Sequence, residues 1–465
     1  MDRNPQRVLS LSLALAAMCT AAVARAQAPK TSPAGGDDRY VFAAGAGQSA
    51  SLPLTATPTG ARATWPAPPA VRPGWDTALV GVVIKTAGLA DTSWIDVSAG
   101  SARVRQHLDG NARGLRWLNI TSLRAALTAG AAMTFEAHAA TLGAEPATVR
   151  VFSTAKEMES ARKRPILILA PHPDDAEIAA FGLYAQSAAA TIVTITSGNA
   201  GDANYHDDVP DAAEQYAWKG YLRALDSVTV PWQGGVPPQR CFNLGYFDAR
   251  LQTMHDKPRD VIPELYGPNQ DVARYRRVNL STLLSNKTRT STWTHLIEDL
   301  RQILAKVRPA AIITPHPILD SHPDHAFVTV ALAEALAGWR APVTLLLYTN
   351  HAAENLYPYG PADTDVGLPP WSARALDVQR VYAHPLDRQM RLRKLYALEA
   401  MHDLRLSPME QSCRPGARRP DYPREPDVDY FRRGPRPEEL FFVYDRDGLQ
   451  TIVRDFLAHP PPPDQ

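Results

Sequence analysis

Strand-like apolar runs alternate with helical periodicity in the second part of the chain, and this alternation constrains the fold most strongly. Residues 166–170 are all apolar, residues 176–189 have a helical pattern, and residues 191–196 form a second strand-like run. Apolar strands that alternate with amphipathic helices are typical of βαβ units. The sequence therefore predicts an α/β domain with a mostly parallel sheet and helices on both faces. Further such elements are expected at residues 296–307 (helix), 310–314 (strand), 326–337 (helix) and 343–348 (strand).

Residues 40–158 have a different pattern, with short β-type runs, Gly and Pro turns and almost no helical period. Short strands at regular spacing predict a small all-β, sandwich-like domain ahead of the α/β domain. The tryptophans of this region are expected in its core, and the alternative is a glycan-binding module with exposed indole rings. These tryptophans are Trp65, Trp75, Trp94 and Trp117.

The first residues have the parts of a secretory signal, with Arg3 and Arg7, an apolar run at residues 8–23, and small residues before the expected cleavage point at Ala26. The apolar run is shorter than the ~20 residues that a membrane-spanning helix needs, which favours export over a membrane anchor. We therefore expect signal peptide 1–26, a periplasmic or secreted protein, and no membrane span after signal removal.

The other boundaries follow from changes in pattern. We assign residues 27–39 to a linker, 163–450 to the α/β domain and 451–465 to a C-terminal tail. Residues 231–292 read as a long irregular insertion in the α/β domain, and loops of this length are usually lids or walls of a site.

Composition narrows the possible partners. The chain has 49 Lys and Arg against 48 Asp and Glu, so it lacks the concentrated basic charge that nucleic acid binding needs. A basic cluster at residues 414–433 also contains acidic residues and prolines and is expected to be a solvated loop. Cys241 and Cys413 could form a disulfide in an oxidising compartment, and the sequence leaves their pairing open.

Two clusters that contain His-Pro-Asp carry the candidate chemistry. Residues 171–177 (Pro-His-Pro-Asp-Asp-Ala-Glu) follow the first predicted strand of the α/β domain, and residues 321–325 (Ser-His-Pro-Asp-His) follow the strand at 310–314. Both lie at carboxyl ends of strands, where open α/β sheets bind ligands. Two histidines and one carboxylate from these loops can hold one zinc ion with a water in the fourth position. Helix capping is the alternative for either cluster alone, but capping does not require a second cluster.

The chemistry of such a site suggests further roles. A carboxylate beside the metal can accept a proton from the attacking water, and Asp174, next to the expected ligand Asp175, fits this role. His322 is suited to protonate the leaving amine, and Asp324 could orient its ring or hold its charge. Two nearby residues are expected to be structural or to lie outside the ligand set: His316 and Asp320.

Residues 170–178 (Ala-Pro-His-Pro-Asp-Asp-Ala-Glu-Ile), with the later His322-Pro323-Asp324-His325, resemble the LmbE-like, or PIG-L, family of zinc-dependent N-acetylglucosaminyl deacetylases. The resemblance covers about residues 164–348 and implies a Rossmann-like fold. It implies one zinc ion per chain, with His172, Asp175 and His325 as the ligands. It also implies Asp174 as general base and His322 as acid or oxyanion partner, linked to Asp324.

The same resemblance implies that the protein removes the N-acetyl group from an amino-sugar-containing substrate. With export, an extracytoplasmic glycan, glycolipid or glycosylated metabolite is the expected class. Residues 196–198 and 244–248 also resemble loops that line the family's site. The family often has a sugar-holding arginine early in its second helix, whereas residues 213–219 here offer Glu214, Gln215 and Lys219.

Two other functions use the same features. A two-metal phosphoesterase would need bridging carboxylates and more ligands than the three assigned above. A non-catalytic secreted glycan-binding protein would have lost activity, although all the expected catalytic residue types are present. Two histidines and one carboxylate can also bind iron(II) or cobalt in place of zinc.

Overall fold

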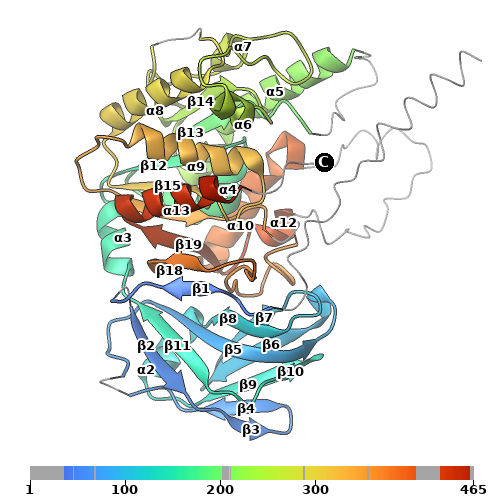
Figure 1. The fold of residues 1–465 in the computed structure, drawn as a ribbon, viewed down its shortest axis with the longest axis vertical. Helices are drawn as coiled ribbons and strands as arrows, with labels where there is room; N and C mark the ends of the chain where they lie inside the picture. Colours follow the sequence, from blue (N-terminus) through green and yellow to red (C-terminus); the bar gives the residue numbers. More distant parts are fainter. Residues whose placement is uncertain are drawn as a thin grey trace, which may run out of the picture.

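The computed structural model describes residues 36–45, 47–67, 70–201, 209, 211–285, 289–352, 356–404 and 430–460. Within these residues the protein is a mixed α/β structure with several sheets (Figure 1). The expected signal peptide, most of the linker and Cys413 lie outside the described residues. No helix in the described part of the chain is long and apolar enough to cross a membrane.

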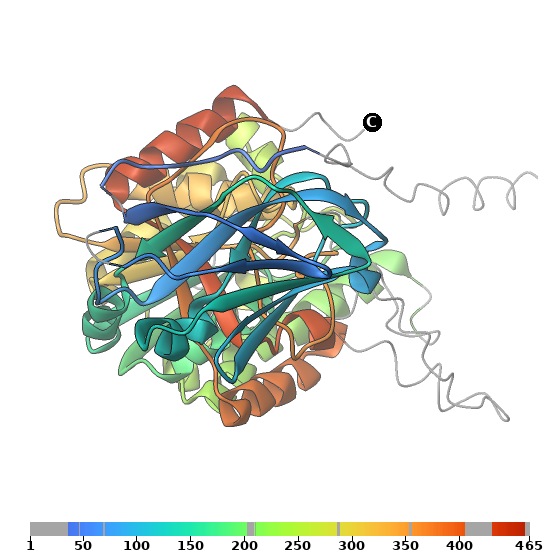
Figure 2. The same cartoon turned by 90° about the horizontal axis from the view of Figure 1, so that it is seen from below.

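Two antiparallel sheets form one end of the molecule, and Figure 2 views the protein from this end. Their strands are β2 (Gln48–Leu52), β3 (Thr55–Thr57), β4 (Gly60–Ala63), β5 (Thr77–Ala87), β6 (Trp94–Ala99), β7 (Ala102–His107), β8 (Gly114–Asn119), β9 (Met133–His138), β10 (Ala140–Leu142) and β11 (Ala147–Phe152). One sheet has the order β10-β5-β11-β2 with β8 also paired to β5, and the other has the order β3-β4-β9-β6-β7. Both sheets contribute to one apolar core, for example through Val80 of β5 and Phe135 of β9. Three short helices accompany these strands: η1 (Ala90–Thr92), η2 (Thr121–Leu123) and α2 (Arg124–Thr128).

The tryptophans of this region are mainly packed against other side chains. Trp75 and Trp117 are buried, as expected for core residues, while Trp65 and Trp94 are partly exposed. The ring of Trp94 stacks on His138 at 4.8 Å between centroids and lies 4.6 Å from the Arg105 guanidinium. Neighbouring side chains therefore already contact the Trp94 ring.

The start of the described chain departs from the expected domain boundary. Strand β1 (Tyr40–Phe42) pairs in parallel with β17 (Leu376–Val378), far along the sequence. Asp38, expected in a linker, is buried, and its Oδ1 accepts a hydrogen bond from the Trp371 backbone N–H at 2.9 Å. A strand of three residues has too few side chains for its pattern to indicate its partner. Only the tertiary contacts reveal that residues 38–42 pack against the C-terminal part.

The larger sheet has seven strands in the order β14-β13-β12-β15-β16-β19-β18. These strands are β12 (Pro165–Ala170), β13 (Ala189–Thr196), β14 (Cys241–Tyr246), β15 (Ala311–Pro315), β16 (Thr344–Tyr348), β18 (Arg380–Pro385) and β19 (Glu438–Tyr444). The first five strands of this order are parallel, and β19 is antiparallel to both β16 and β18. The parallel strands therefore end at one common edge.

Helices cover both faces of this sheet. Leu167 and Leu169 of β12 belong to one apolar cluster and Ile166 and Ile168 to another, because alternate side chains of a strand point to opposite faces. This burial on both sides explains why the strand is continuously apolar. The first cluster includes residues of α6 (Leu251–Asp256), α8 (Trp293–Val307), α9 (Pro323–Ala335) and α13 (Arg446–Ala458). The second includes residues of α3 (Ala155–Arg162), α4 (Asp175–Ala185) and α10 (Arg388–Glu399). The remaining helices are α5 (Ala212–Thr229), η3 (Val230–Gly234), η4 (Pro238–Arg240), α7 (Ala273–Arg276), η5 (His402–Leu404) and α12 (Tyr430–Arg433).

The segment expected to be an irregular insertion, residues 231–292, contains the edge strand β14 of the larger sheet. Asn243 and Gly245 interrupt the apolar pattern of this strand. The Asn243 amide is nevertheless satisfied, since it donates to the Thr196 carbonyl at 3.1 Å and to Ser227 Oγ at 3.0 Å. Buried Cys241 begins β14.

The expected C-terminal tail, residues 451–465, is also corrected, because α13 continues to Ala458. Its buried residues Leu449, Ile452, Val453 and Phe456 have the spacing of one helix face. The proline-rich residues that follow dominate the composition of residues 451–465, so this segment did not indicate a helix.

A buried carboxylate from β19 supports a break in α4, the helix that begins at Asp175. The backbone of Ala180 is non-helical, with φ −141° and ψ 19°. Glu439 accepts hydrogen bonds from the Gly182 and Leu183 N–H groups at 2.8 and 2.9 Å, and from Lys394 Nζ at 2.8 Å. Glu439 therefore caps the second half of α4 and forms a fully buried ion pair.

Replacing Glu439 by alanine is expected to lower the free energy of unfolding by about 3–5 kcal/mol, because the Lys394 charge then stays buried without its partner. Urea denaturation followed by circular dichroism measures this loss. Glu159→Ala is the matched control, since Glu159 pairs with Lys163 on an exposed helix surface and its loss should have a much smaller effect on stability. Equal losses in the two variants would contradict the prediction.

Candidate metal centre

Polar residues follow each parallel strand at the carboxyl edge of the sheet. Because these strands are neighbours, residues far apart in the sequence meet at this edge. The residues are His172, Asp174 and Asp175 after β12; Ser197 and Gly198 after β13; Asp248 after β14; His316, Asp320, His322, Asp324 and His325 after β15; and Asn350 and His351 after β16.

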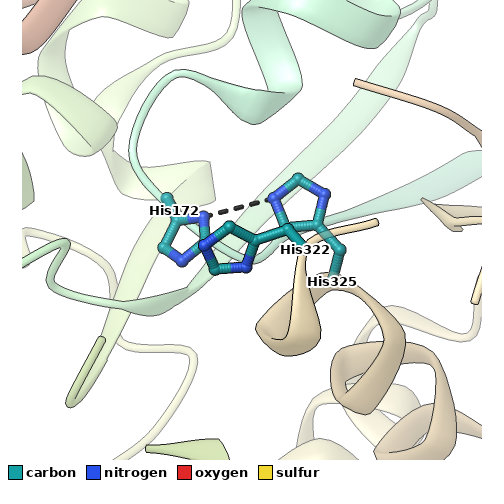
Figure 3. Close-up of side chains that lie close together, drawn as sticks. All are labelled: His172, His322 and His325. Carbon is teal, nitrogen blue, oxygen red and sulfur yellow. Dashed lines mark hydrogen bonds between the residues drawn. The ribbon is translucent and has the colours of Figure 1, made fainter. Parts of the chain in front are cut away.

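Three side-chain atoms converge between the loop after β12 and the start of α9. His172 Nδ1 lies 3.2 Å from Asp175 Oδ2 and 3.2 Å from His325 Nε2, and His325 Nε2 lies 3.1 Å from Asp175 Oδ2. All three side chains are buried. In Figure 3 the His172 imidazole points toward the His325 imidazole across the gap between the two loops. The structure thus brings together the three residues expected to be ligands.

This triangle fits a metal ion. Ligands about 2.0–2.1 Å from a tetrahedral zinc ion lie roughly 3.3 Å from one another, close to the distances found here. Two imidazole nitrogens and a carboxylate oxygen also direct their lone pairs toward a common point. A cation at that point would interact favourably with all three. Other groups in the described residues that could hold a metal each share a residue with this triangle: His172, His322 and His325; Asp175, His325 and His351; and His172, Asp248 and Asp324.

The comparisons with known proteins agree with these motifs. Residues 167–336 match the family model described as GlcNAc-PI de-N-acetylase, PIG-L. This segment is therefore similar to the PIG-L family. Both motif loops and both ligand histidines lie within it.

Solved structures with similar chains include the A40926 pseudoaglycone deacetylase Dbv21, at 18% identity and a TM-score of 0.33, covering 61% of this chain and 98% of that chain. The zinc-inhibited form of teicoplanin deacetylase Orf2 has 15% identity and a TM-score of 0.31, covering 60% of this chain and 98% of that chain. The conserved protein TT1542 from Thermus thermophilus has 18% identity and a TM-score of 0.27, covering 51% of this chain and 78% of that chain. No curated protein sequence matches significantly.

Each of the two candidate ligand histidines has a carboxylate near its other ring nitrogen. His172 Nε2 lies 3.0 Å from Asp248 Oδ1, and His325 Nδ1 lies 2.9 Å from Asp320 Oδ2. Such partners set the tautomer and ring orientation of a metal-bound histidine. Asp320 therefore lies outside the ligand set, as expected. Asp248 was expected only as part of a lining loop, and no predicted strand marked its position, because residues 231–292 were expected to be irregular.

His316 is structural, as expected. Its Nδ1 accepts hydrogen bonds from the Ile318 and Leu319 N–H groups at 3.3 and 3.2 Å, which holds the turn after β15. Burial lowers the pKa of this imidazole to about 3, so it stays neutral at physiological pH.

Asp174 has an unusual backbone conformation, with φ +108° and ψ −31°. Non-glycine residues rarely adopt positive φ, and such strain is concentrated at functional sites. The carboxylate does not cap α4, which argues against helix capping as its role. Instead its Oδ2 accepts a hydrogen bond from Arg223 Nη2 at 3.0 Å. Burial raises the pKa of Asp174 to about 7 although Arg223 opposes the shift, so this carboxylate can exchange a proton near neutral pH.

Arg223 is an arginine of α5 that the sequence reasoning did not indicate. It lies one turn beyond Lys219 on α5, and its guanidinium also donates to the carbonyls of Pro173 and Gly198. Gly198 has φ +67°, and a Cβ there would come within 2.6 Å of Arg223 Nη1. The glycine of the Thr196-Ser197-Gly198 loop therefore leaves room for the guanidinium.

His322 caps helix α9 with its own ring. Nδ1 accepts a hydrogen bond from the Asp324 backbone N–H at 3.2 Å, so the neutral imidazole has its hydrogen on Nε2. Burial and the nearby imidazoles, His172 first among them, hold the pKa of His322 well below its usual value. A bound cation would lower it further. His322 is therefore suited to donate a hydrogen bond rather than to act as a charged acid.

The expected role of Asp324 is corrected. Its carboxylate does not orient the His322 ring, because it accepts hydrogen bonds from the Ala249 and Leu251 N–H groups at 2.7 and 3.2 Å. Its Oδ2 also lies 3.5 Å from His172 Nε2. Asp324 therefore joins the loop after β14 to the metal centre.

Two residues after β16 were missed by the sequence reasoning. Asn350 Nδ2 donates to Asp175 Oδ1 at 2.7 Å, and the His351 ring lies 4.7 Å from the His325 ring. No motif marks them. Their position after a predicted strand at 343–348 was the one available signal.

Proposed function

We propose that the protein is a zinc-dependent N-deacetylase that hydrolyses the N-acetyl group of an amino-sugar-containing glycan, glycolipid or glycosylated metabolite. The observation that carries this proposal is the buried triangle of His172, Asp175 and His325, with Asp174 beside it in a strained, arginine-bound position. The PIG-L match of residues 167–336 supports the same reaction.

A bound zinc ion would supply a polarised water and a positive charge near the acyl oxygen. Asp174 accepts a proton from the attacking water as the new C–O bond forms. When the C–N bond breaks, its electron pair goes to nitrogen, and Asp174 returns the proton to that nitrogen. The His322 Nε2–H donates a hydrogen bond to the acyl oxygen while negative charge develops there. Arg223 holds Asp174 in place throughout.

We also propose a fold type, a domain organisation and a location for the protein. The strands β12 to β16 have the chain order 3-2-1-4-5 across the sheet, which is the order of the first five strands of a Rossmann fold. Residues 43–158 act as an accessory β-sandwich, and the protein is exported after removal of residues 1–26. The substrate is accordingly extracytoplasmic.

The test uses the chain from residue 27 onward, loaded with zinc and assayed for acetate release from N-acetylated mono- and oligosaccharides. We expect release of acetate by a protein with one zinc per chain, loss of activity on chelation, and recovery when zinc is added back. Two metal ions per chain with phosphoester hydrolysis would favour the phosphoesterase instead. Sugar binding without acetate release would favour a non-catalytic glycan-binding protein.

A further inference from the structure

The side chains around the metal triangle differ in exposure. His172, Asp175 and His325 are buried, whereas His322, His351 and Tyr430 are partly exposed. His322 belongs to the second motif, but His351 and Tyr430 lie outside the segment that matches the PIG-L family. These three partly exposed side chains offer polar groups beside the centre.

His351 is fixed in place through its backbone. Asp320 Oδ2, which accepts from His325, also accepts hydrogen bonds from the Asn350 and His351 N–H groups at 2.8 and 3.3 Å. The His351 carbonyl accepts from both the backbone N–H and the hydroxyl of Ser321 at 2.7 Å. One His351 ring nitrogen lies within 4.8 Å of ligand atoms of Asp175 and His325. The ring therefore borders the metal centre in a defined position.

Tyr430, at the start of α12, contacts this ring. Its hydroxyl oxygen lies 3.3 Å from His351 Nδ1. The Arg433 guanidinium lies over the Tyr430 ring at 4.1 Å, and Arg433 Nη1 donates to the Asn350 carbonyl at 3.4 Å. Contacts with the loop after β16 thus fix the positions of both Tyr430 and His351. Burial raises the pKa of Tyr430 to about 12, so the hydroxyl keeps its proton at neutral pH.

We infer that Tyr430 is a catalytic residue whose hydroxyl donates a hydrogen bond to the acyl oxygen of the substrate, and that His351 is its positioning residue. His351 donates its Nδ1–H to the phenolic oxygen, which leaves the hydroxyl proton for the substrate. The inference rests on the proposed function. As water oxygen bonds to the carbonyl carbon, the π electron pair moves onto the acyl oxygen, and the hydrogen bonds from Tyr430 and His322 strengthen. The same pair re-forms the carbonyl when the C–N bond breaks.

The first experiment compares Tyr430→Phe with wild type. Loss of one oxyanion donor typically lowers kcat by about 10²–10³-fold, and we expect this loss with little change in KM and with zinc content unchanged. Tyr396→Phe is the matched control, because Tyr396 is 63% exposed on α10, and we expect no change there. An unchanged kcat in Tyr430→Phe overturns the inference.

A second variant separates positioning from metal binding. His351→Gln keeps a hydrogen-bonding side chain beside Tyr430, and we expect a smaller loss of kcat with zinc affinity as in wild type. Loss of zinc from His351→Gln would overturn the inference, since His351 would then be a metal ligand.

Binding of acetohydroxamate to the zinc-loaded protein, measured by calorimetry, tests the inference without a known substrate. We expect Tyr430→Phe to weaken this binding at least tenfold and Tyr396→Phe to leave it unchanged. That result in a protein that releases no acetate would reject the proposed function and leave Tyr430 as a hydrogen-bond donor to acyl ligands of the metal centre. Equal affinities of Tyr430→Phe and wild type, or no binding by wild type, would overturn the inference.

Discussion

Replacing Asp174 by asparagine is expected to lower kcat by about 10²–10⁴-fold while the protein keeps its zinc, because a carbonyl oxygen cannot take the proton of the attacking water. Asparagine is the suitable substitution here for two reasons. It tolerates the positive φ of +108° better than most residues, and its oxygen can still accept from Arg223. Steady-state acetate release and metal analysis of the same sample measure the two effects.

Asp403→Asn is the matched control for this variant. Asp403 Oδ2 lies 3.2 Å from Arg223 Nη1, so both aspartates contact the same guanidinium, but Asp403 follows α10 rather than the metal-binding loop. We expect a much smaller change in kcat for Asp403→Asn. A kcat in Asp174→Asn close to that of wild type would exclude Asp174 as the base.

Replacing His325 by alanine is expected to abolish both zinc retention and acetate release. Only His172 and Asp175 of the triangle remain, and two ligands cannot complete the set of three that a catalytic zinc needs. His325 is fully buried at the start of α9. Metal analysis after dialysis against a chelator measures the retention.

Asp320→Asn is the graded comparison for His325→Ala. It leaves the ligand in place and weakens only the hydrogen bond to His325 Nδ1, so we expect zinc affinity to fall about 10–100-fold and activity to return at saturating zinc. If His325→Ala bound one zinc per chain as tightly as wild type, the ligand assignment would be wrong.

The local pattern of the sequence was enough to predict the elements around the centre. The apolar run at 166–170 forms β12, the helix face with Leu296, Leu300 and Ile303 is buried in α8, and the two clusters meet at one edge of the sheet. Strand and helix periodicity are local properties, and parallel strands place their carboxyl ends together in any such fold. The three candidate ligands could therefore be named before their distances were known.

Other elements depended on distant contacts. The Asn243 amide of β14 is satisfied by Thr196 and Ser227, so a strand with a polar interior residue forms where the pattern indicated an irregular loop. Arg223 reaches Asp174 because Gly198 leaves space, and nothing in the spacing of α5 indicates which of its basic residues turns inward.

By itself the sequence determined the α/β pattern, the two motif loops and the residue types of a metal site, because these depend on neighbours within a few positions. The tertiary structure alone decided that Asp324 accepts hydrogen bonds from the loop after β14, that Asp248 and Asp320 lie beside the candidate ligand histidines, and that His351 and Tyr430 lie next to this centre. Asp320 lies only five positions before His325, but the other contacts join residues tens to hundreds of positions apart. Which side chains meet across such separations depends on how the strands, helices and loops pack together rather than on any local pattern.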